Sequence, residues 1–475
     1  MKRIVRKEGM KRTAWERRKG LYRKLYKELY KKSHKKSHKK TAALLLAAAL
    51  CGLLAGCGEQ EKEAVTLVVK APSMEMNCVS DTQIDNVEAF MEKAASAFVG
   101  QYEAADVTVD LQIFPLAEEM EAIPECFDTP DAADVIYDGY FNMASYIHTG
   151  RVVPLDDMIT DEMRSDIDDP LWQMSRIGGK TYMMPYLNMQ NVLIYNKTLF
   201  EECGLERYFG EGKEIQTWTI EEWTDILDTL AQKLPEGTYP MMMYAGNNQG
   251  DTHTMSRMRA FGGGIFDEEG NFDLEDERIV QALAWMQDGA DRNWYPPHSE
   301  NLVIKNCSEL FANGQLAIYH FNNANTMLYE DIDGYGFVNY PGGAATAFPN
   351  GFEVFDNGDD RKIQVAKDFV RYIYETEELL ELSAGNIPAS RKVTEKYEDR
   401  IVMLREFTEN SSHVVDFMNN SPNWQGREDS VRSVFWPHIH ALLLGTVTPQ
   451  ECAKGLNEDC NAALAAGRAE SVLHE

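Results

Sequence analysis

Hydrophobic residues beyond position 64 fall into short runs typical of strands, separated by longer stretches with helical spacing. Strand patterns occur at "VTLVVKA" (65–71), "VTVDLQIF" (107–114) and "ADVIYDG" (133–139). Between the first two, "IDNVEAFMEKAASAF" (84–98) places its apolar residues on one helical face, and Asp85 with Glu88 at position +3 predicts the N-terminal cap. This strand–helix–strand repetition predicts parallel sheets with helices on both faces.

The same alternation continues towards the C-terminus. A helix led by Thr219, with Glu222 at capping-box spacing, is predicted in "TWTIEEWTDILDTLAQKL" (217–234). Two apolar strands, within 239–253 and 311–325, each run into a polar cluster, and ligands of such sheets gather beyond the carboxyl ends of the strands. Further helices are predicted within 267–293 and 364–391, and a crossing between two lobes within 177–205.

The first 56 residues have a different pattern. Residues 2–40 are basic, and "TAALLLAAALCGLLAG" (41–56) is apolar and uncharged but shorter than the about 20 residues that span a membrane. A positive region, a short apolar core and small residues predict a secretory signal. The long basic lead-in has two explanations, a basic amphipathic helix on the inner membrane face or a start codon assigned too far upstream, with Met10 as one alternative.

The end of this segment, Leu54-Ala55-Gly56-Cys57, resembles the bacterial lipobox, in which the cysteine thiol is acylated and becomes the new N-terminus. Acyl chains hold a protein on a membrane because each buried methylene contributes about 0.8 kcal/mol. We therefore expect residues 1–56 to be a lipoprotein signal segment, lipidation at Cys57, and residues 57–64 to be a polar tether. The expected location is the extracytoplasmic face of the cell membrane. The alternative is an ordinary signal peptide with a chance cysteine.

Charge separates these two parts of the chain. Residues 1–56 hold 18 of the 47 Lys and Arg residues and three of the 76 acidic residues. The remainder carries 29 bases and 73 acids, a net charge of 29 − 73, or −44. A body this acidic repels phosphate backbones, which argues against a nucleic-acid partner, and it stays at an anionic membrane only if it is tethered.

Six cysteines follow Cys57, and they form no CxxC pair and no zinc spacing. Cys452 and Cys460, on one predicted helix, would lie about 12 Å apart, beyond the reach of a disulfide. We expect these six cysteines to be mostly buried small hydrophobic residues, with their disulfide state left open. No cofactor and no metal are expected.

Five motifs carry a resemblance to a known family. In chain order they are "GKTYMMPY…VLIYNKTLFEECGL", "TWTIEEWTDIL", "LFANGQLAIYH", "NIPASR" and "LLLGTVTPQECAKGLNEDCNAAL". They resemble the corresponding motifs of the extracellular solute-binding proteins of bacterial ABC importers, the group that includes maltose-binding protein. Each motif alone is weak, but their order over residues 65–467, behind a lipobox, indicates this family.

The resemblance implies an α/β fold of the two-lobed periplasmic-binding-protein type (type II), with a ligand cleft between lobes that close over the ligand. It implies that residues 65–184 plus 307–340 form one lobe and residues 185–306 plus 341–475 the other. It also implies a monomeric, non-enzymatic receptor that delivers a small-molecule solute to an ABC permease. A binding protein that signals to a membrane sensor is the alternative to an importer.

Family position and the ends of the predicted strands indicate the same candidate ligand-binding residues. The expected set is Ser73, Glu75, Asp138, Tyr140, Tyr186, Asn188, Asn247, Asn248, Gln249, Asp251, Phe321, Asn322, Asn323, Asn325, Trp424 and Gln425. Amides and carboxylates match hydroxyl groups, and flat rings pack against the apolar C–H faces of sugars. The set favours a carbohydrate over an anion, which would require Arg or helix N-termini. Trp424 has packing, and Asn247 and Asn248 have turn formation, as alternative roles.

Other ligands and functions stay open. Acidic and aromatic residues also suit a polyamine, and a peptide is a further alternative. A secreted lipoprotein enzyme such as a glycoside hydrolase would need two carboxylates flanking a bond, and the chain has no GxSxG, HExxH or P-loop motif. A metal site would draw on His438, His440, His253 and His320, yet the first two point in different directions on a helix.

Overall fold

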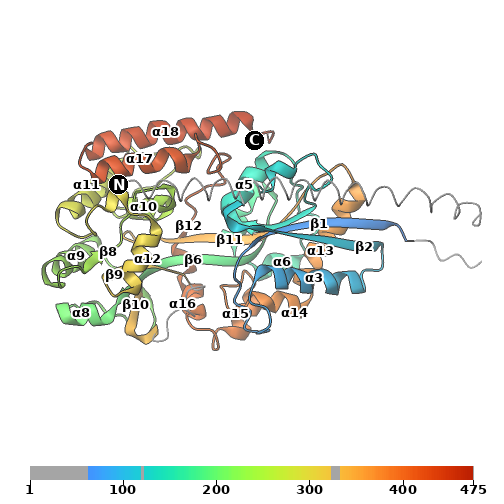
Figure 1. Cartoon of the computed structure of the whole chain (residues 1–475), viewed down its shortest axis with the longest axis horizontal. Coiled ribbons are helices and arrows are strands. Elements are labelled where there is room, and N and C mark those ends of the chain that lie inside the picture. The colour runs from blue at the N-terminus through green and yellow to red at the C-terminus, as the bar shows by residue number, and fades with distance from the viewer. Residues whose placement is uncertain (1–61, 119–121, 323–331, 474–475) are drawn as a thin grey trace, which may run out of the picture. The chain divides into compact units, whose positions relative to one another are not determined.

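The computed structural model describes residues 62–118, 122–322 and 332–473, so the predicted signal segment and Cys57 lie outside the described residues. Residues from Glu63 onward form one compact unit. Its centre is a ten-stranded sheet in the order β2-β1-β3-β11-β6-β10-β7, with β9 also paired to β6, β8 to β9, and β12 to β11 (Figure 1). Within the described residues, no helix has both the length and the apolar character needed to span a membrane.

The three strands predicted first in the sequence are confirmed and pair in parallel. They are β1 (Ala64–Ser73), β2 (Asp106–Pro115) and β3 (Val135–Gly139). Helix α3 (Val87–Gln101) connects β1 to β2, and its cap is Asn86, whose side chain accepts a hydrogen bond from the N–H of Ala89 at 2.8 Å. The predicted cap, Asp85, was wrong by one residue: its carboxylate accepts from the Asn86 side chain instead.

The rest of the sheet is mostly antiparallel, so the prediction of parallel sheets holds only in part. The central strand β6 (Met184–Asn196) pairs antiparallel with β11 (Ala345–Val354), β9 (Leu316–Asn322) and β10 (Tyr335–Val338). The shorter strands are β4 (Arg176–Ile177), β5 (Lys180–Thr181), β7 (Ile215–Gln216), β8 (Tyr239–Met241) and β12 (Val414–Val415).

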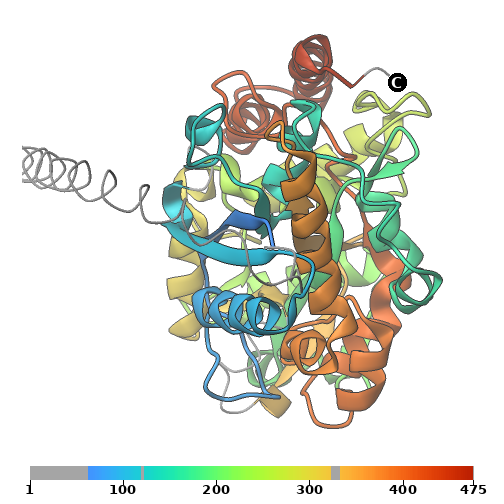
Figure 2. The same cartoon turned by 90° about the vertical axis from the view of Figure 1, so that its right-hand side faces the viewer.

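Helices cover both faces of the sheet around β3, as predicted. Val135 and Tyr137 face a cluster that includes α3 and α13 (Asp360–Glu375), whereas Ile136 faces the side covered by α5 (Tyr140–His148). Helices α3 and α13 lie side by side, with the rings of Phe98 and Phe369 5.3 Å apart (Figure 2). The polar end of β3 therefore leads directly into α5.

Helices occur in the predicted segments 217–234, 267–293 and 364–391, and further helices lie before, between and after these segments. The longer ones are α9 (Ile220–Lys233), α10 (Asp251–Met258), α11 (Glu277–Asp291), α12 (Ile304–Ala312), α17 (Val431–Leu443) and α18 (Pro449–Glu470). The shorter ones are α6 (Asp161–Asp166), α7 (Asp169–Met174), α8 (Lys197–Cys203), α14 (Glu377–Leu380), α15 (Arg391–Tyr397) and α16 (Leu404–Glu409). The capping box of Thr219 and Glu222 at the start of α9 is confirmed. Cys452 and Cys460 are both buried on α18, and the six described cysteines are free thiols, only Cys126 being part-exposed.

Two large hydrophobic clusters divide the described chain differently from the predicted lobes. The first cluster is built around β1, α3 and α13, and the second around β6, β9 and α11. Residues 307–340, predicted to belong with 65–184, pack in the second cluster because β9 and β10 pair with the C-terminal half of β6. Residues 352–382 pack in the first cluster because the end of β11 pairs with β3.

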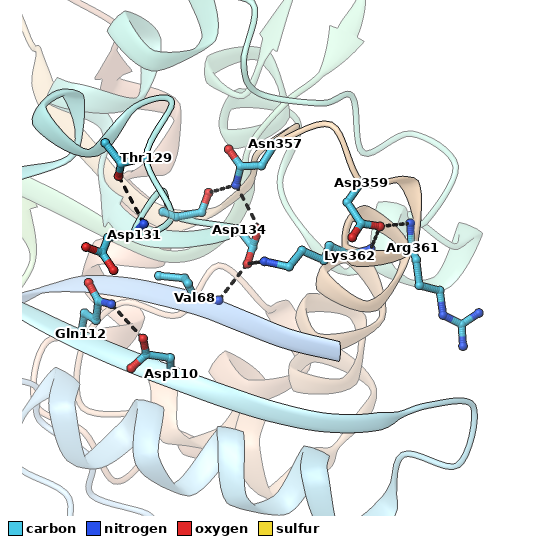
Figure 3. A network of polar contacts seen from close by, with 11 residues as sticks. Val68, Asp110, Gln112, Thr129, Asp131, Asp134, Asn357, Asp359, Arg361 and Lys362 are labelled. Atoms are coloured by element: carbon cyan, nitrogen blue, oxygen red, sulfur yellow. Dashed lines mark hydrogen bonds and ion pairs between the residues drawn. The ribbon is translucent and has the colours of Figure 1, made fainter. Parts of the chain in front are cut away.

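A buried carboxylate fixes the edge of the first cluster (Figure 3). Asp134, 1% exposed, accepts hydrogen bonds from the N–H of Val68 at 2.8 Å and from the side chain of Asn357 at 2.9 Å. Lys362, on α13, forms an ion pair with the same carboxylate at 3.0 Å. Asp134 thus joins β1, the start of β3 and α13, and it sets the direction in which β3 delivers Asp138.

Candidate functional site

The candidate site begins at the end of β3. Asp138, predicted from the sequence, is 1% exposed, and its carboxylate accepts from the N–H of Gly139 at 2.7 Å and from the side chain of Asn142 at 3.2 Å. Asn142 lies in the first turn of α5, four residues after Asp138. A buried carboxylate needs such donors, because it loses its hydration on folding.

The hydrogen bonds continue from Asn142 to segments of the second cluster. The side-chain oxygen of Asn142 accepts from the Gln425 side-chain amide at 2.5 Å, and the side-chain oxygen of Gln425 accepts from the guanidinium of Arg432 at 2.6 Å. Arg432, on α17, then forms an ion pair with Asp251, at the start of α10, with 2.9 Å between Nε and Oδ2. We call these five residues, Asp138, Asn142, Gln425, Arg432 and Asp251, the polar chain.

The polar chain ends in a buried ion pair. Asp251 is 1% exposed, and burial raises the pKa of its carboxyl above the ordinary value although the charge of Arg432 acts in the opposite direction. Arg432 also donates to the main-chain oxygen of Asn248 at 3.2 Å. The guanidinium therefore fixes the loop that follows β8 against the start of α17.

Two half-exposed aromatic rings lie beside the polar chain. Phe141 on α5 and Phe348 on β11 are stacked with ring centroids 4.6 Å apart and planes 26° apart. The guanidinium of Arg432 lies 4.9 Å from the centroid of Phe141. Met189, which is opposite Phe348 in the pairing of β6 with β11, is also partly exposed. Aromatic faces next to hydrogen-bonding groups are suited to a ligand that has an apolar face and polar edges.

Amide side chains at the strand ends supply further polar groups. Asn188 on β6 is 8% exposed, and its side-chain oxygen has no hydrogen-bond partner among the described residues. Asn247 and Gln249 bond to each other, with 3.0 Å between the two side chains. Asn322, at the end of β9, lies opposite Asn191 of β6 and is partly exposed. Asn191 and Asn322 lie on the same face of the sheet as Met189 and Phe348, whereas Asn188 lies on the opposite face.

Several other predicted ligand residues have structural roles here. Tyr186, 1% exposed, donates to the main-chain oxygen of Leu379 at 2.6 Å. Phe321 and Trp424 are fully buried in the second cluster, so their rings present no surface to a solute in this conformation. Trp424 therefore has a packing role in this structure, which is the alternative to ligand binding that the sequence analysis considered.

The remaining predicted residues lie at the edges of this region. Tyr140 donates to the carboxylate of Asp416 at 2.9 Å, which links α5 to the segment before α17. Burial raises the pKa of Tyr140 well above its ordinary value, so its hydroxyl stays protonated as a donor. Ser73 is the last residue of β1, Glu75 lies two residues beyond it, and both are exposed. Asn323 and Asn325 lie outside the described residues.

The histidines considered for a metal have other partners. His438 lies 2.7 Å from the carboxylate of Asp459, and His253 lies 2.5 Å from the hydroxyl of Tyr340. The rings of His253 and His320 are 5.2 Å apart, and burial lowers the pKa of His320 to about 3 and that of His253 well below its usual range. In the part of the chain that the structure describes, no three His, Cys, Asp or Glu side chains converge as metal ligands would.

Sequence reasoning missed four members of this region: Asn142, Phe141, Phe348 and Arg432. A signal was available for the first two, because they follow Asp138 within four residues and lie on α5, the helix that begins directly after β3. Arg432 and Phe348 gave no such signal, since α17 and β11 reach the site only through their packing and strand pairing.

The mixed sheet, the helices on both its faces and the polar strand ends define an α/β binding protein of the two-lobed kind. Residues 82–379, more than half of the chain, match the family model described as bacterial extracellular solute-binding protein, and the chain belongs to that family. The family places the protein outside the cytoplasm.

Similar solved structures confirm the fold. The cyclic alpha-maltosyl-1,6-maltose binding protein from Arthrobacter globiformis superimposes with a TM-score of 0.67 at 17% identity, covering 85% of this chain and 100% of that one. The sugar-binding protein MalE from Xanthomonas citri gives 0.66 at 15% identity, with coverages of 85% and 98%. A Thermotoga lettingae ABC transporter solute-binding protein, bound with alpha-D-tagatose, gives 0.62 at 16% identity, with coverages of 85% and 100%.

A curated relative matches over a shorter stretch. The uncharacterized ABC transporter extracellular-binding protein of Pyrococcus horikoshii is 29% identical over 138 residues, which are 29% of this chain and 28% of that protein. The match therefore spans less than a third of that relative.

Proposed function

We propose that this protein is a lipid-anchored receptor that binds a carbohydrate outside the cytoplasm and delivers it to the permease of an ABC transporter. Family membership supports the solute-binding role, and the lipobox-like Leu54-Ala55-Gly56-Cys57 supports the anchor. The similar cyclic alpha-maltosyl-1,6-maltose binding protein and the similar protein bound with alpha-D-tagatose support a carbohydrate ligand. The receptor carries out no chemistry on its ligand.

The observation that carries the carbohydrate proposal is the stacked Phe141–Phe348 pair beside the polar chain. A pyranose ring has apolar C–H faces, which would pack on these rings, and hydroxyl groups around its edge. Those hydroxyls would bond to the amides of the loop after β8. Each hydroxyl both donates and accepts, which suits a set of amides and carboxylates better than a set of like charges.

Solute binding would act on contacts between the two clusters. Phe141 and Asn142 extend from the helix after β3, whereas Gln425 and Arg432 belong to segments packed in the second cluster. A solute that contacts both sides stabilises the arrangement in which they are close, by the difference in its affinity for the two arrangements. The resulting closed form would be the one that addresses the permease.

The test of the ligand is a thermal-shift screen of the purified protein against mono- and oligosaccharides, a polyamine and short peptides. We expect a sugar to stabilise the fold, by about 2.7 kcal/mol at a hundred times its dissociation constant. Phe141→Ala should weaken binding of that sugar at least about tenfold, the loss of one good contact of roughly 1.4 kcal/mol. The matched control is Phe209→Ala, a half-buried ring that packs on Tyr195 away from the polar chain. Stabilisation by polyamine or peptide alone would refute the carbohydrate assignment.

The anchor has a separate test. Cells that express the full chain with a labelled fatty acid should yield labelled protein in the membrane fraction. Cys57→Ala should remove the label and release the protein from the membrane, whereas Cys51→Ala, the matched control within the same apolar run, should leave both unchanged. Membrane-bound, labelled Cys57→Ala protein would overturn the proposed anchor.

A further inference from the structure

Lys70 and Cys126 form a close side-chain pair away from the polar chain. Lys70 lies opposite Ile136 in the pairing of β1 with β3, so its side chain points to the face of the sheet that α5 and residues 122–127 cover. It is 5% exposed, and its ammonium donates to the sulfur of Cys126 at 3.0 Å. Neither residue belongs to the proposed solute site.

The ammonium of Lys70 has no carboxylate to balance it in the part of the chain that the structure describes. Its hydrogen-bond partner there is the Cys126 sulfur, and it forms no ion pair with a described acid. Asp128, the acid two residues after Cys126, is paired instead with Arg151 at 2.7 Å. A buried ammonium loses its hydration on folding and is costly without an opposite charge nearby. The sulfur, as a thiolate, is the group placed to supply that charge.

Cys126 also differs from the other described cysteines in its access to solvent. It ends the one-turn 3₁₀ helix Pro124–Cys126 and is partly exposed, whereas the other five are buried. Burial raises the pKa of Cys78, Cys307 and Cys452 to about 12, which keeps these thiols protonated. Reactive cysteines combine solvent access with a nearby cation, and among the described cysteines Cys126 has both.

We propose that Cys126 is a modification site, at which a hydroperoxide oxidises the thiol to a sulfenic acid with the help of Lys70. The sulfur attacks the outer oxygen of the peroxide, so that an S–O bond forms and the O–O bond breaks. The sulfur loses two electrons, and the peroxide is reduced to an alcohol or, from hydrogen peroxide, to water. The departing oxygen takes up the proton that the thiol releases. This modification is independent of the receptor function.

Lys70 acts in this step as a hydrogen-bond donor. Its N–H groups stabilise the thiolate before the attack and the departing oxygen anion during it. The other contact of the sulfur is with the main-chain oxygen of Ala122 at 3.2 Å, which accepts the hydrogen of the thiol. Outside the cytoplasm, where the family places this protein, thiols are exposed to oxidants without the reducing systems of the cytoplasm.

The test treats the intact protein with hydrogen peroxide and dimedone, which reacts with sulfenic acids, and locates the adduct by peptide mass spectrometry. We expect dimedone on Cys126 and not on the five buried cysteines. Lys70→Gln should slow the labelling of Cys126 at least about tenfold. The matched control is Lys454→Gln, which removes an exposed lysine of α18 and should leave the rate unchanged. Labelling of a buried cysteine in place of Cys126 would overturn the proposal.

A second measurement does not require a variant to fold. In the folded wild type, Cys126 should react with peroxide at least about tenfold faster than in the same chain unfolded in urea, because unfolding removes Lys70 from the sulfur. An equal or slower reaction in the folded chain would overturn the proposal. So would an unchanged rate in Lys70→Gln protein that has the circular dichroism of the wild type. Neither result bears on solute binding, since Phe141 and the polar chain are intact in every variant.

Discussion

Glu353 has an unusual environment for a carboxylic acid. It is fully buried on β11, and neither of its carboxylate oxygens has a hydrogen-bond partner among the described residues. Burial raises the pKa of Glu353 well above its ordinary value, and the nearby charge of Asp138 raises it further. The two lie on the same face of the sheet, because Glu353 is opposite Ile136 and Gly351 is opposite Asp138. Burial and the charge of Asp138 therefore both favour the protonated form of Glu353 in the folded protein.

This leads to a prediction for Glu353→Gln, which replaces the acid with a neutral side chain of the same shape. Above the ordinary pKa of 4.5, the unfolded chain releases the proton of Glu353 and the folded protein keeps it. The wild type should therefore lose stability as pH rises from 4.5, whereas the variant should lack this contribution. The difference in the free energy of unfolding, measured by urea denaturation, should widen with pH by up to about 1.4 kcal/mol per unit. A difference that is constant from pH 5 to pH 8 would contradict the neutral state.

Arg432 gives a second prediction at this scale. Arg432→Met should cost about 3–5 kcal/mol, because it leaves Asp251 as a buried carboxylate without its ion-pair partner. Adding Asp251→Asn should recover part of that loss in urea denaturation. The control is Arg405→Met, which removes an exposed ion pair with Asp399 and should change stability by about 1 kcal/mol or less. An Arg432→Met protein as stable as the control would show that the polar chain carries no such pair.

The residues of the candidate site were predictable only where a local pattern marked them. Asp138 stands at the end of a strand, Asp251 at the start of a helix and Gln425 in the loop before the last two helices, and the polar chain brings all three together. Phe321 and Trp424 stand in similar sequence positions, yet their rings turn into the second cluster. Whether a side chain at the end of a strand faces the core or the ligand depends on tertiary packing, which a sequence pattern does not contain.

Among the secondary-structure elements, the junction of β1, β3 and α13 depends on one side chain. Asp134 accepts from the main chain of β1 and from Asn357, and it is paired with Lys362 of α13 (Figure 3). No pattern in the sequence singles out this residue, because its partners lie as far as 228 positions away. The hydrogen bonds and the ion pair of Asp134 should nevertheless contribute to the stability of the first cluster.

We accordingly expect Asp134→Ala to lower the free energy of unfolding by about 3–5 kcal/mol, since it leaves the buried N–H of Val68 without an acceptor and Lys362 without its partner. The comparison is Asp131→Ala, three residues earlier in an exposed turn, which should change stability by less than about 0.5 kcal/mol. Equal stability of the two variants in urea would contradict the role assigned to Asp134.

Some boundaries of helices and strands can be predicted from local sequence signals alone. The capping box at Thr219 fixed the start of α9 correctly, because all its partners lie within four residues. Within the segment 177–205, predicted as a crossing between two lobes, a single strand β6 runs from Met184 to Asn196 and includes Pro185 as its second residue. The assignment of 307–340 to the first lobe differed for a related reason: pairing of β9 with β6 is a contact between segments more than 100 residues apart.

At the scale of the whole molecule, the two large hydrophobic clusters are connected by side-chain contacts as well as by the central sheet. The polar chain and the bond from Tyr140 to Asp416 both connect α5 to the segments around α17. Tyr140 and Met143 of α5 also pack in the second cluster, and a ligand that adds interactions here would change how firmly the two clusters are joined. Solute recognition and the joining of the clusters thus use the same residues.

The central claim is that a carbohydrate binds on the Phe141–Phe348 pair next to the polar chain. The most direct measurement is the crystal structure of the protein with the sugar that stabilises it most in the thermal-shift screen. We predict a sugar ring packed on the Phe141–Phe348 pair, with its hydroxyl groups bonded to residues of the polar chain. A sugar found elsewhere in the molecule, with Phe141 and Phe348 uncovered, would contradict this account.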